Sequence, residues 1–119
     1  MKRFEDYLKA IYMLKEKNNC ARIRDLAKIL NVSPATVIEY LRKLSREGLV
    51  IYEKGCKCID LTPKGLEVAR RIYNRYRIVK EFLRNVLGVP IEIAEKDACY
   101  IEHGIHEVTL EKMKTLINS

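Results

Sequence analysis

The stretch over residues 22–49 constrains the fold of this chain more than any other. It contains two short helical patterns on either side of Asn31, a residue type that tolerates the left-handed backbone at a helix end. Ser33 is suited to cap the second helix, and Pro34 fits its first position, where no amide hydrogen is needed. Ala27 is small enough for the two helices to cross closely. The stretch predicts a helix-turn-helix, and the alternative is an ordinary helical hairpin.

The second helix of this stretch has an apolar side and a polar side. The apolar residues, together with the end of the first helix, point into one core: Leu30, Val37, Leu41 and Leu44. The polar side begins with small residues and continues with cations, a pattern that suits the major groove of DNA. The candidates for contact with bases are Ser33, Pro34, Ala35, Thr36 and Glu39. The candidates for contact with phosphates are Arg22, Arg24, Arg42, Lys43, Arg46, Lys54 and Lys57.

Hydrophobic periodicity and turn residues predict the remaining elements. The predicted elements are helices over residues 4–17, 22–30 and 34–47, strands over 49–53 and 58–61, and helices over 63–87, 91–103 and 108–118. Gly48 and Gly88 are suited to end the helices before them, and Gly55 can take a positive φ between the strands. Thr62 and Pro63 are suited to open the long helix. Three helices and a hairpin predict a winged helix, and an α-bundle with an added hairpin is the alternative.

The long helix over residues 63–87 indicates a dimer. At about 1.5 Å per residue it extends about 37 Å, more than a winged helix alone can cover. Its wide apolar face therefore predicts contact with a second copy of the chain, and a homodimer presents two recognition helices to a palindromic site. The predicted fold is mainly α, with an N-terminal winged helix-turn-helix DNA-binding domain over 1–62 and an α-helical dimerisation domain over 63–119.

The charge balance favours a polyanionic partner such as double-stranded DNA. The 119 residues carry a net charge of +7, of which +5 lies in residues 1–62 and +2 in residues 63–119. A solvated surface with no such partner is the alternative. No apolar run approaches the roughly 20 residues of a membrane span. Residues 1–6 enter a helical pattern and lack a signal-peptide core, which predicts a cytoplasmic protein with no membrane partner.

The four cysteines are predicted to be reduced, as is usual in the cytoplasm. They are Cys20, Cys56, Cys58 and Cys99, and their spacing matches no zinc-finger pattern. Cys56 and Cys58 are alternate residues of a predicted strand, so both side chains lie on one face. They could form a thiol pair, and the favoured interpretation is two surface cysteines with no role.

The segment around residue 100 contains residue types that bind transition metals. Cys99, Glu102 and His103 are spaced at i, i+3 and i+4, which places a thiol, a carboxylate and an imidazole on one helical face. Glu95 lies one turn before Cys99, and His106 lies one turn after Glu102. Such a mixed set suits Fe²⁺, Co²⁺, Ni²⁺ or Zn²⁺ better than Mg²⁺ or Ca²⁺. The alternative is a set of charged residues on an exposed helix beside a buried cysteine.

Segments spread over nearly the whole chain carry a resemblance to a known family. They are Glu5–Leu14 (EDYLKAIYML), Asp25–Val37 (DLAKILNVSPATV), Leu44–Val50 (LSREGLV), Leu61–Gly65 (LTPKG), Glu81–Leu83 (EFL), Leu87–Gly88 and Ala98–His103 (ACYIEH). The chain resembles the metal-dependent repressors of the diphtheria toxin repressor and manganese transport regulator type. The resemblance implies a homodimeric winged-helix regulator that binds divalent metal between its two regions and then grips an operator, typically to repress metal-uptake genes. The length resembles that of the shorter members, without an SH3-like domain.

The resemblance also implies a set of metal ligands. Cys99, Glu102 and His103 fall on family ligands, and Asp6 falls on the ligand from the first helix. Glu95 falls where some members have a ligand of a second site. In this layout the metal ties the first helix to the dimerisation helices, so that metal binding and DNA affinity are linked.

Three positions depart from the family pattern. Tyr76 replaces a histidine, Lys80 replaces a carboxylate found in some members, and Lys9 replaces a glutamate of the manganese-type members. A protonated lysine cannot bind a metal. We therefore expect at most one ion per subunit, with Lys9 or Lys80 in place of the second. The thiolate of Cys99 favours Fe²⁺ over Mn²⁺, with Co²⁺, Ni²⁺ and Zn²⁺ also suited. The alternative is that metal control is lost and DNA binding is constitutive.

Three other classes of function are alternatives to a metal-dependent repressor. A cysteine nucleophile with a histidine base could support hydrolysis, but no phosphate loop or oxyanion motif accompanies them, so we do not expect an enzyme. A thiol-redox sensor could use Cys56, Cys58 or Cys99. A non-specific architectural DNA binder would show a steep salt dependence with little preference among sequences.

Overall fold

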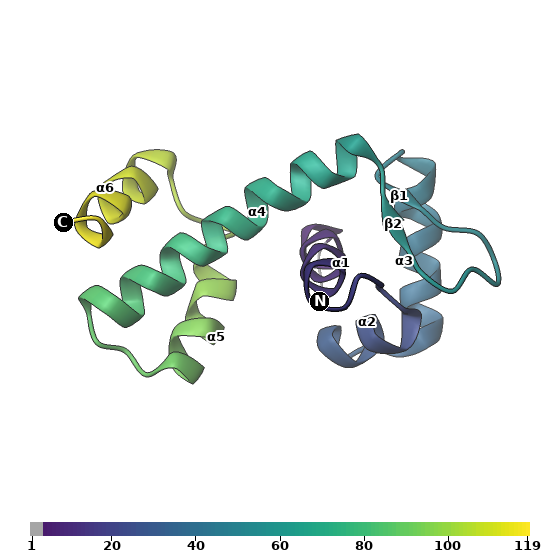
Figure 1. The fold of residues 1–119 in the computed structure, drawn as a ribbon, viewed down its shortest axis with the longest axis horizontal. Coiled ribbons are helices and arrows are strands. Elements are labelled where there is room, and N and C mark those ends of the chain that lie inside the picture. Colours follow the sequence, from purple (N-terminus) through teal and green to yellow (C-terminus); the bar gives the residue numbers. More distant parts are fainter. Residues whose placement is uncertain (1–3) are drawn as a thin grey trace. The chain divides into compact units, whose positions relative to one another are not determined.

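The chain folds into two compact units that divide within one long helix, as the computed structural model shows (Figure 1). One unit runs up to Arg70 and the other from Arg71 to Ser119. The structure describes residues 4–119, so the first three residues of the N-terminal segment, where we looked for a signal peptide, lie outside it. In the described part, no helix is both long enough and apolar enough to cross a membrane.

The observed elements confirm a mainly helical fold with a small wing. They are α1 (Phe4–Asn18), α2 (Ile23–Leu30), α3 (Pro34–Arg46), β1 (Val50–Ile51), β2 (Asp60–Leu61), α4 (Pro63–Glu81), η1 (Phe82–Val86), α5 (Ile91–Ile101) and α6 (Glu107–Ile117). The strands are shorter than predicted. The long helix has the predicted extent, but its last turn, η1, has π-helical geometry.

The turn between α2 and α3 forms as its residues predict. Asn31 adopts the left-handed conformation, with φ 55° and ψ 49°. The Ser33 hydroxyl accepts a hydrogen bond from the Thr36 amide at 3.1 Å, and Pro34 occupies the first turn of α3. At the other end of α3, Gly48 has a φ of 74°, and the Leu49 amide donates to the Leu44 carbonyl at 3.0 Å. The predicted caps of the recognition helix are confirmed.

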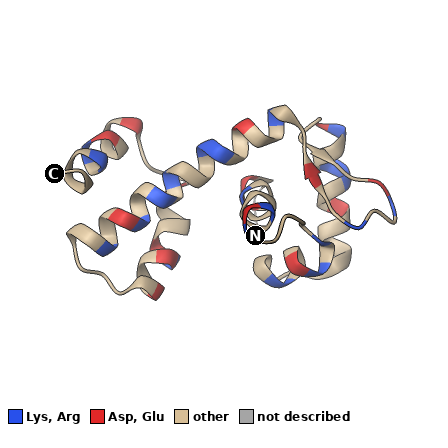
Figure 2. Cartoon of the chain, viewed as in Figure 1, with Lys and Arg blue, Asp and Glu red and all other residues tan. Residues whose placement is uncertain are grey.

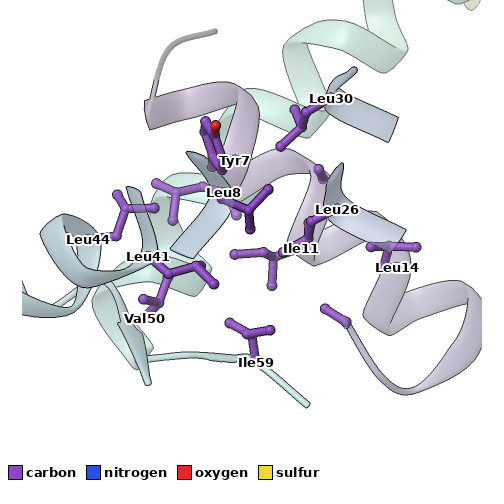
Figure 3. Packing of buried hydrophobic residues seen from close by; sticks show 14 of the residues in the cluster. Tyr7, Leu8, Ile11, Leu14, Leu26, Leu30, Leu41, Leu44, Val50 and Ile59 are labelled. Atoms are coloured by element: carbon purple, nitrogen blue, oxygen red, sulfur yellow. The ribbon is translucent and has the colours of Figure 1, made fainter. Parts of the chain in front are cut away.

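The apolar side of α3 lies in the core of the first unit (Figure 3). Val37, Leu41 and Leu44 are fully buried. They belong to a cluster with residues of α1, α2 and the wing, in which Tyr7 also stacks on Tyr40 with ring centroids 4.7 Å apart. Because one side of α3 is used for packing, its opposite side is left at the surface.

The wing is held at its base by two pairings. β1 and β2 are antiparallel, with Val50 opposite Leu61. Just before β2, the Ile59 amide donates to the Ala21 carbonyl at 2.8 Å. The returning side of the wing therefore also pairs with the loop between α1 and α2. At the tip, Gly55 takes the predicted positive φ, 87°. The short β1–β2 ladder leaves the residues between them as a long loop.

The prediction that every cysteine is reduced is wrong. Cys20 and Cys58 form a disulfide, with their Cα atoms 5.2 Å apart. The physical reason is the pairing of Ala21 with Ile59, which brings the two neighbouring cysteines within bonding distance. The suggested pairing of Cys56 with Cys58 is wrong as well, since Cys56 keeps its thiol.

The start of α4 is fastened to the end of α3. The Thr62 hydroxyl accepts from the Gly65 amide at 3.0 Å and donates to the Gly48 carbonyl at 2.6 Å. The helix approaches so closely that a Cβ atom on Gly65 would lie 1.9 Å from the carbonyl oxygen of Leu49. Only glycine fits at this position, because the obstructing atom belongs to the backbone.

The second unit has its own small core. It is formed by Tyr76, Ile78, Val79, Leu83, Ala94, Ala98 and Leu110. Ala94 and Ala98, two small residues of α5, are fully buried in it. Gly88 has a φ of 74°, and the chain turns there after η1 as predicted.

The contact at Gly65 generates a stability prediction. Gly65→Ala should lower the free energy of unfolding by about 1–3 kcal/mol or more, because an added methyl group forces the backbone of Leu49 to move. Gly104→Ala is the matched control, since a Cβ atom at Gly104 meets nothing within 4 Å. Denaturant unfolding without added metal measures both. Equal stability of the two variants would contradict the close approach.

Candidate nucleic-acid interface and metal ligands

The surface side of α3 carries the residues predicted to meet bases. Ser33, Pro34, Ala35 and Glu39 are exposed, and Thr36 is half-buried. Two of the polar groups already have partners on the helix. The hydroxyls of Ser33 and Thr36 lie 2.9 Å apart, and the Glu39 carboxylate lies 3.8 Å from the Lys43 ammonium. This side of α3 can therefore face the major groove of DNA. The ammonium of Lys43 partly neutralises the negative charge of Glu39.

A concave, mainly cationic surface lies between α3 and the wing. It is lined by Glu39, Arg42, Lys43, Ser45, Arg46, Tyr52 and Lys54. Four of these side chains are positively charged and one is negative. Figure 2 shows blue segments of Lys and Arg along α3 and in the wing loop. Such a surface suits the phosphates that flank a groove.

The other predicted phosphate contacts lie at two edges of the same unit. Arg22 and Arg24 are exposed at the start of α2, and Lys57 is exposed in the wing loop. All seven of the predicted phosphate contacts are therefore at the surface.

A salt titration tests the role of the wing. Lys54→Ala should weaken binding to two unrelated DNA duplexes alike and reduce the slope of log K against log salt by roughly one unit, because one phosphate contact is lost. Lys17→Ala, an exposed lysine at the end of α1, is the matched control and should leave the slope unchanged. A change in sequence preference with an intact slope would contradict the assignment of Lys54.

Glu102 and His103 lie side by side at the end of α5. The Glu102 side chain is fully buried, and its Oε1 atom lies 3.6 Å from Nε2 of His103. The helix α5 ends at Ile101, before the predicted end at residue 103. Glu102 nevertheless keeps helical backbone angles. Cys99 is exposed. The burial pattern expected in the alternative is therefore wrong, because the carboxylate is buried and the cysteine is exposed.

The remaining predicted ligands differ in exposure. Glu95 is exposed on α5, and His106 is exposed just before α6. Asp6 is half-buried in the first turn of α1, in the unit that ends at Arg70. Within the second unit, the structure brings Glu102 and His103 together. They form a nitrogen and oxygen pair that suits a transition metal, and Cys99, on the preceding turn, can add sulfur.

Tyr76 lies within the electrostatic reach of these residues. Burial raises the pKa of its phenol strongly, and the negative charges of Cys99, Glu95 and Glu102 raise it further. The Lys80 ammonium lies 5.1 Å from the centre of the Tyr76 ring, within cation–π range. A phenol that keeps its proton is a poor metal ligand. A protonated phenol and a lysine ammonium are thus what the structure has at positions 76 and 80.

The raised pKa of Tyr76 has a consequence for stability. Above the usual tyrosine pKa of 10.0 the unfolded chain loses the Tyr76 proton, while the folded chain keeps it. The free energy of unfolding of the metal-free protein should therefore fall as pH rises past this value. Tyr76→Phe should remove that part of the fall, measured by denaturant unfolding at a series of pH values. Tyr100→Phe, at an exposed position, is the control. An unchanged pH profile in Tyr76→Phe would refute the assignment.

Sequence reasoning missed two features of the first unit. The disulfide joins residues separated by 38 positions, and no local spacing marks such a pair. Lys9 of α1 is buried, whereas a lysine in a helix is usually expected on an exposed polar face. Lys9 follows Leu8 in a helix whose next residues are also buried, and that wide buried face was the available signal.

A winged helix with a cationic recognition helix, in a chain that also has a metal-ligand cluster, defines a metal-responsive DNA-binding regulator. The chain belongs to the iron-dependent repressor family. Residues 1–56 match "Iron dependent repressor, N-terminal DNA binding domain", and residues 62–119 match "Iron dependent repressor, metal binding and dimerisation domain". The protein is therefore a metal-dependent, DNA-binding transcriptional repressor of the diphtheria toxin repressor and manganese transport regulator type. It has a dimerisation domain that binds divalent metal, and it is not an enzyme.

Individual relatives agree with this membership. The chain is 40% identical to an uncharacterized HTH-type transcriptional regulator of Methanocaldococcus jannaschii, over 92% of this chain and 88% of that protein. It is 35% identical to the HTH-type transcriptional regulator MntR of Bacillus pumilus, over 95% of this chain and 77% of that one. A manganese-dependent transcriptional repressor solved in complex with manganese is 27% identical and superposes with a TM-score of 0.86, over 98% of this chain and 53% of that one. The chain thus spans about half the length of that solved repressor.

Proposed function

We propose that the protein acts as a homodimer that represses metal-uptake genes by binding a palindromic operator when it holds a divalent metal ion. The observation that carries this proposal is that one chain matches a DNA-binding domain and a metal-binding and dimerisation domain of the same family. A dimer presents two α3 helices, and two identical readers favour a site with two-fold symmetry. Such a repressor works where the chromosome is, so we also propose a cytoplasmic location.

We take residues 1–62 as the DNA-binding domain and residues 63–119 as the dimerisation and metal-sensing domain. The family matches, which end at residue 56 and resume at residue 62, support this functional division. The compact units divide later, after Arg70, because the first turns of α4 pack with the winged helix through Gly65 and Thr62.

Within the DNA-binding domain, residues of α3 contact the bases and so give sequence preference. Cationic residues on and around α3 contact the phosphates and so add affinity. The base contacts proposed for α3 are Ser33, Pro34, Ala35, Thr36 and Glu39. The proposed phosphate contacts are Arg22, Arg24, Arg42, Lys43, Arg46, Lys54 and Lys57. Their exposure and the cationic surface between α3 and the wing support both assignments.

For the metal we propose one ion per subunit, held by Cys99, Glu102, His103 and Asp6. The buried Glu102 carboxylate beside the His103 imidazole supports the first part of the set. Asp6 belongs to the other compact unit and joins the set on the family resemblance alone. Glu95 is a weaker candidate because its side chain is exposed. When bound, the ion supplies a fixed link among its ligands.

The ligand types of the proposed site bear on which metal it prefers. The residues that depart from the family pattern bear on whether one ion or two are bound per subunit. The manganese complex belongs to a relative, whereas the thiolate of Cys99 shifts the preference here toward Fe²⁺, with Co²⁺, Ni²⁺ and Zn²⁺ next. A protonated Tyr76 with Lys80 over its ring supports the loss of a second site. The charge of Lys80, or of the buried Lys9, takes the place of the second cation.

A metal titration tests this proposal. Equilibrium dialysis under anaerobic conditions should give one Fe²⁺ per subunit, bound more tightly than Mn²⁺. Glu102→Gln should lose that ion because the carboxylate is replaced by a neutral amide. Glu92→Gln, at an exposed acid on the same helix, is the matched control. Two tightly bound ions per subunit would contradict the proposed replacement of the second cation.

The link between metal and DNA has a measurable size. Coupling between two sites of one protein typically changes affinity by about 5- to 150-fold. Fe²⁺ should strengthen operator binding within this range, measured by fluorescence anisotropy with and without a chelator. Indifference to the chelator would favour the alternative, a repressor whose metal site has degenerated and which binds DNA constitutively.

A further inference from the structure

We propose that Cys20 and Cys58 form a reversible thiol–disulfide site that sets DNA affinity through the wing. The inference rests on the proposed function in one respect, the contact of Lys54 and Lys57 with DNA phosphates. The disulfide joins the loop between α1 and α2 to the returning side of the wing loop. It therefore ties a rigid part of the first unit to the segment that carries both lysines.

The base of the wing does not need this bond. Ala21 and Ile59 are fully buried and paired through a backbone hydrogen bond of 2.8 Å. Next to them, Lys15 and Asp60 form an ion pair. These contacts hold the returning chain from Ile59 onward whether or not the cysteines are bonded.

The wing tip depends on the bond far more. Between Tyr52 and Cys58, the backbone hydrogen bond from the Cys56 amide to the Glu53 carbonyl closes a local turn and ties the loop to no other element. The Cys20 sulfur lies 3.9 Å from the carbonyl oxygen of Lys57, so the disulfide lies directly against the backbone of that lysine. Reduction leaves the base intact and frees the tip.

Both cysteines are half-buried, so a small thiol can reach the bond. A dithiol reductant attacks one sulfur through its thiolate, forms a mixed disulfide and releases the other cysteine as a thiolate, which takes up a proton. Its second thiol then displaces the remaining cysteine. The products are two protein thiols and the oxidised, cyclic form of the reductant, so two electrons and two protons have moved to the protein.

The effect on DNA follows from the entropy of the tip. Fixing the backbone of one residue corresponds to about a tenfold change in an equilibrium constant. When the wing tip is mobile, the entropy of ordering its backbone is lost on DNA binding. The phosphate contacts of Lys54 and Lys57 therefore weaken. Reduction should therefore lower affinity about tenfold and flatten the salt slope by up to about two units. Because phosphates carry no sequence information, the loss should be the same for every duplex.

The experiment measures anisotropy of a random-sequence duplex with the dimeric protein, oxidised or reduced by a dithiol, at one fixed metal concentration. Mass spectrometry confirms the state of the thiols. The double variant Cys20→Ser/Cys58→Ser should bind as weakly as the reduced protein and ignore the reductant. Cys56→Ser, which leaves the disulfide in place, is the matched control and should respond like the original chain.

Several results would overturn the proposal. One is equal affinity of the oxidised and reduced proteins, which would make the bond a structural cross-link only. Another is a reductant effect that persists in the double variant, which would place it at Cys99 or at the metal. Wild-type reduction gives the answer even where the double variant folds poorly. If Lys54→Ala and Lys57→Ala change nothing in the oxidised protein while reduction still weakens binding, the lysine assignment fails and the redox site stands.

Discussion

The close approach of Gly65 to the Leu49 carbonyl is the contact on which the rest of the first unit depends. It brings the start of α4 against the end of α3, where Thr62 bonds to both Gly48 and Gly65. The orientation of the recognition helix and the direction of the long helix are thus set by the same few backbone atoms. A movement of the first turn of α4 would therefore be transmitted to the end of α3, because the backbone at Gly65 and Leu49 is packed too closely to allow an added methyl group. In the proposed function, this contact would help to link metal binding to DNA binding.

The second unit has a buried phenol and a lysine at two positions where the family resemblance implies metal ligands. Burial and three nearby negative charges keep the proton on Tyr76, and the Lys80 ammonium over its ring adds positive charge. A neutral phenol stabilised by a cation needs no ion to balance it. Glu102 differs, because a buried carboxylate requires a positive partner and the imidazole of His103 lies 3.6 Å from it. The burial of Glu102 beside His103 supports its place in the proposed ligand set, in which Tyr76 has no part.

Much of the fold could be predicted because its signals are local. Asn31, Ser33 and Pro34 determine the turn between α2 and α3 through their own backbone preferences, and the structure has each of them in the predicted conformation. The disulfide could not be predicted in this way. Its two cysteines meet only because Ile59 pairs with Ala21, and that pairing depends on the tertiary packing of α1 against the wing. The burial of Glu102 was likewise hidden, since spacing shows which residues share a face but not which face is covered.

The first unit separates two tasks of DNA recognition. The recognition helix is held by the noncovalent packing of three fully buried residues, Val37, Leu41 and Leu44. The wing tip is held by a covalent bond that a thiol can open. In the proposed function, contacts to bases come from the rigid element, and contacts to phosphates come partly from the adjustable one. A change at the wing therefore scales affinity for all sequences and leaves preference among them intact. A metal-induced movement of α3 would change how the bases are read, so the two controls act on different terms of the binding free energy.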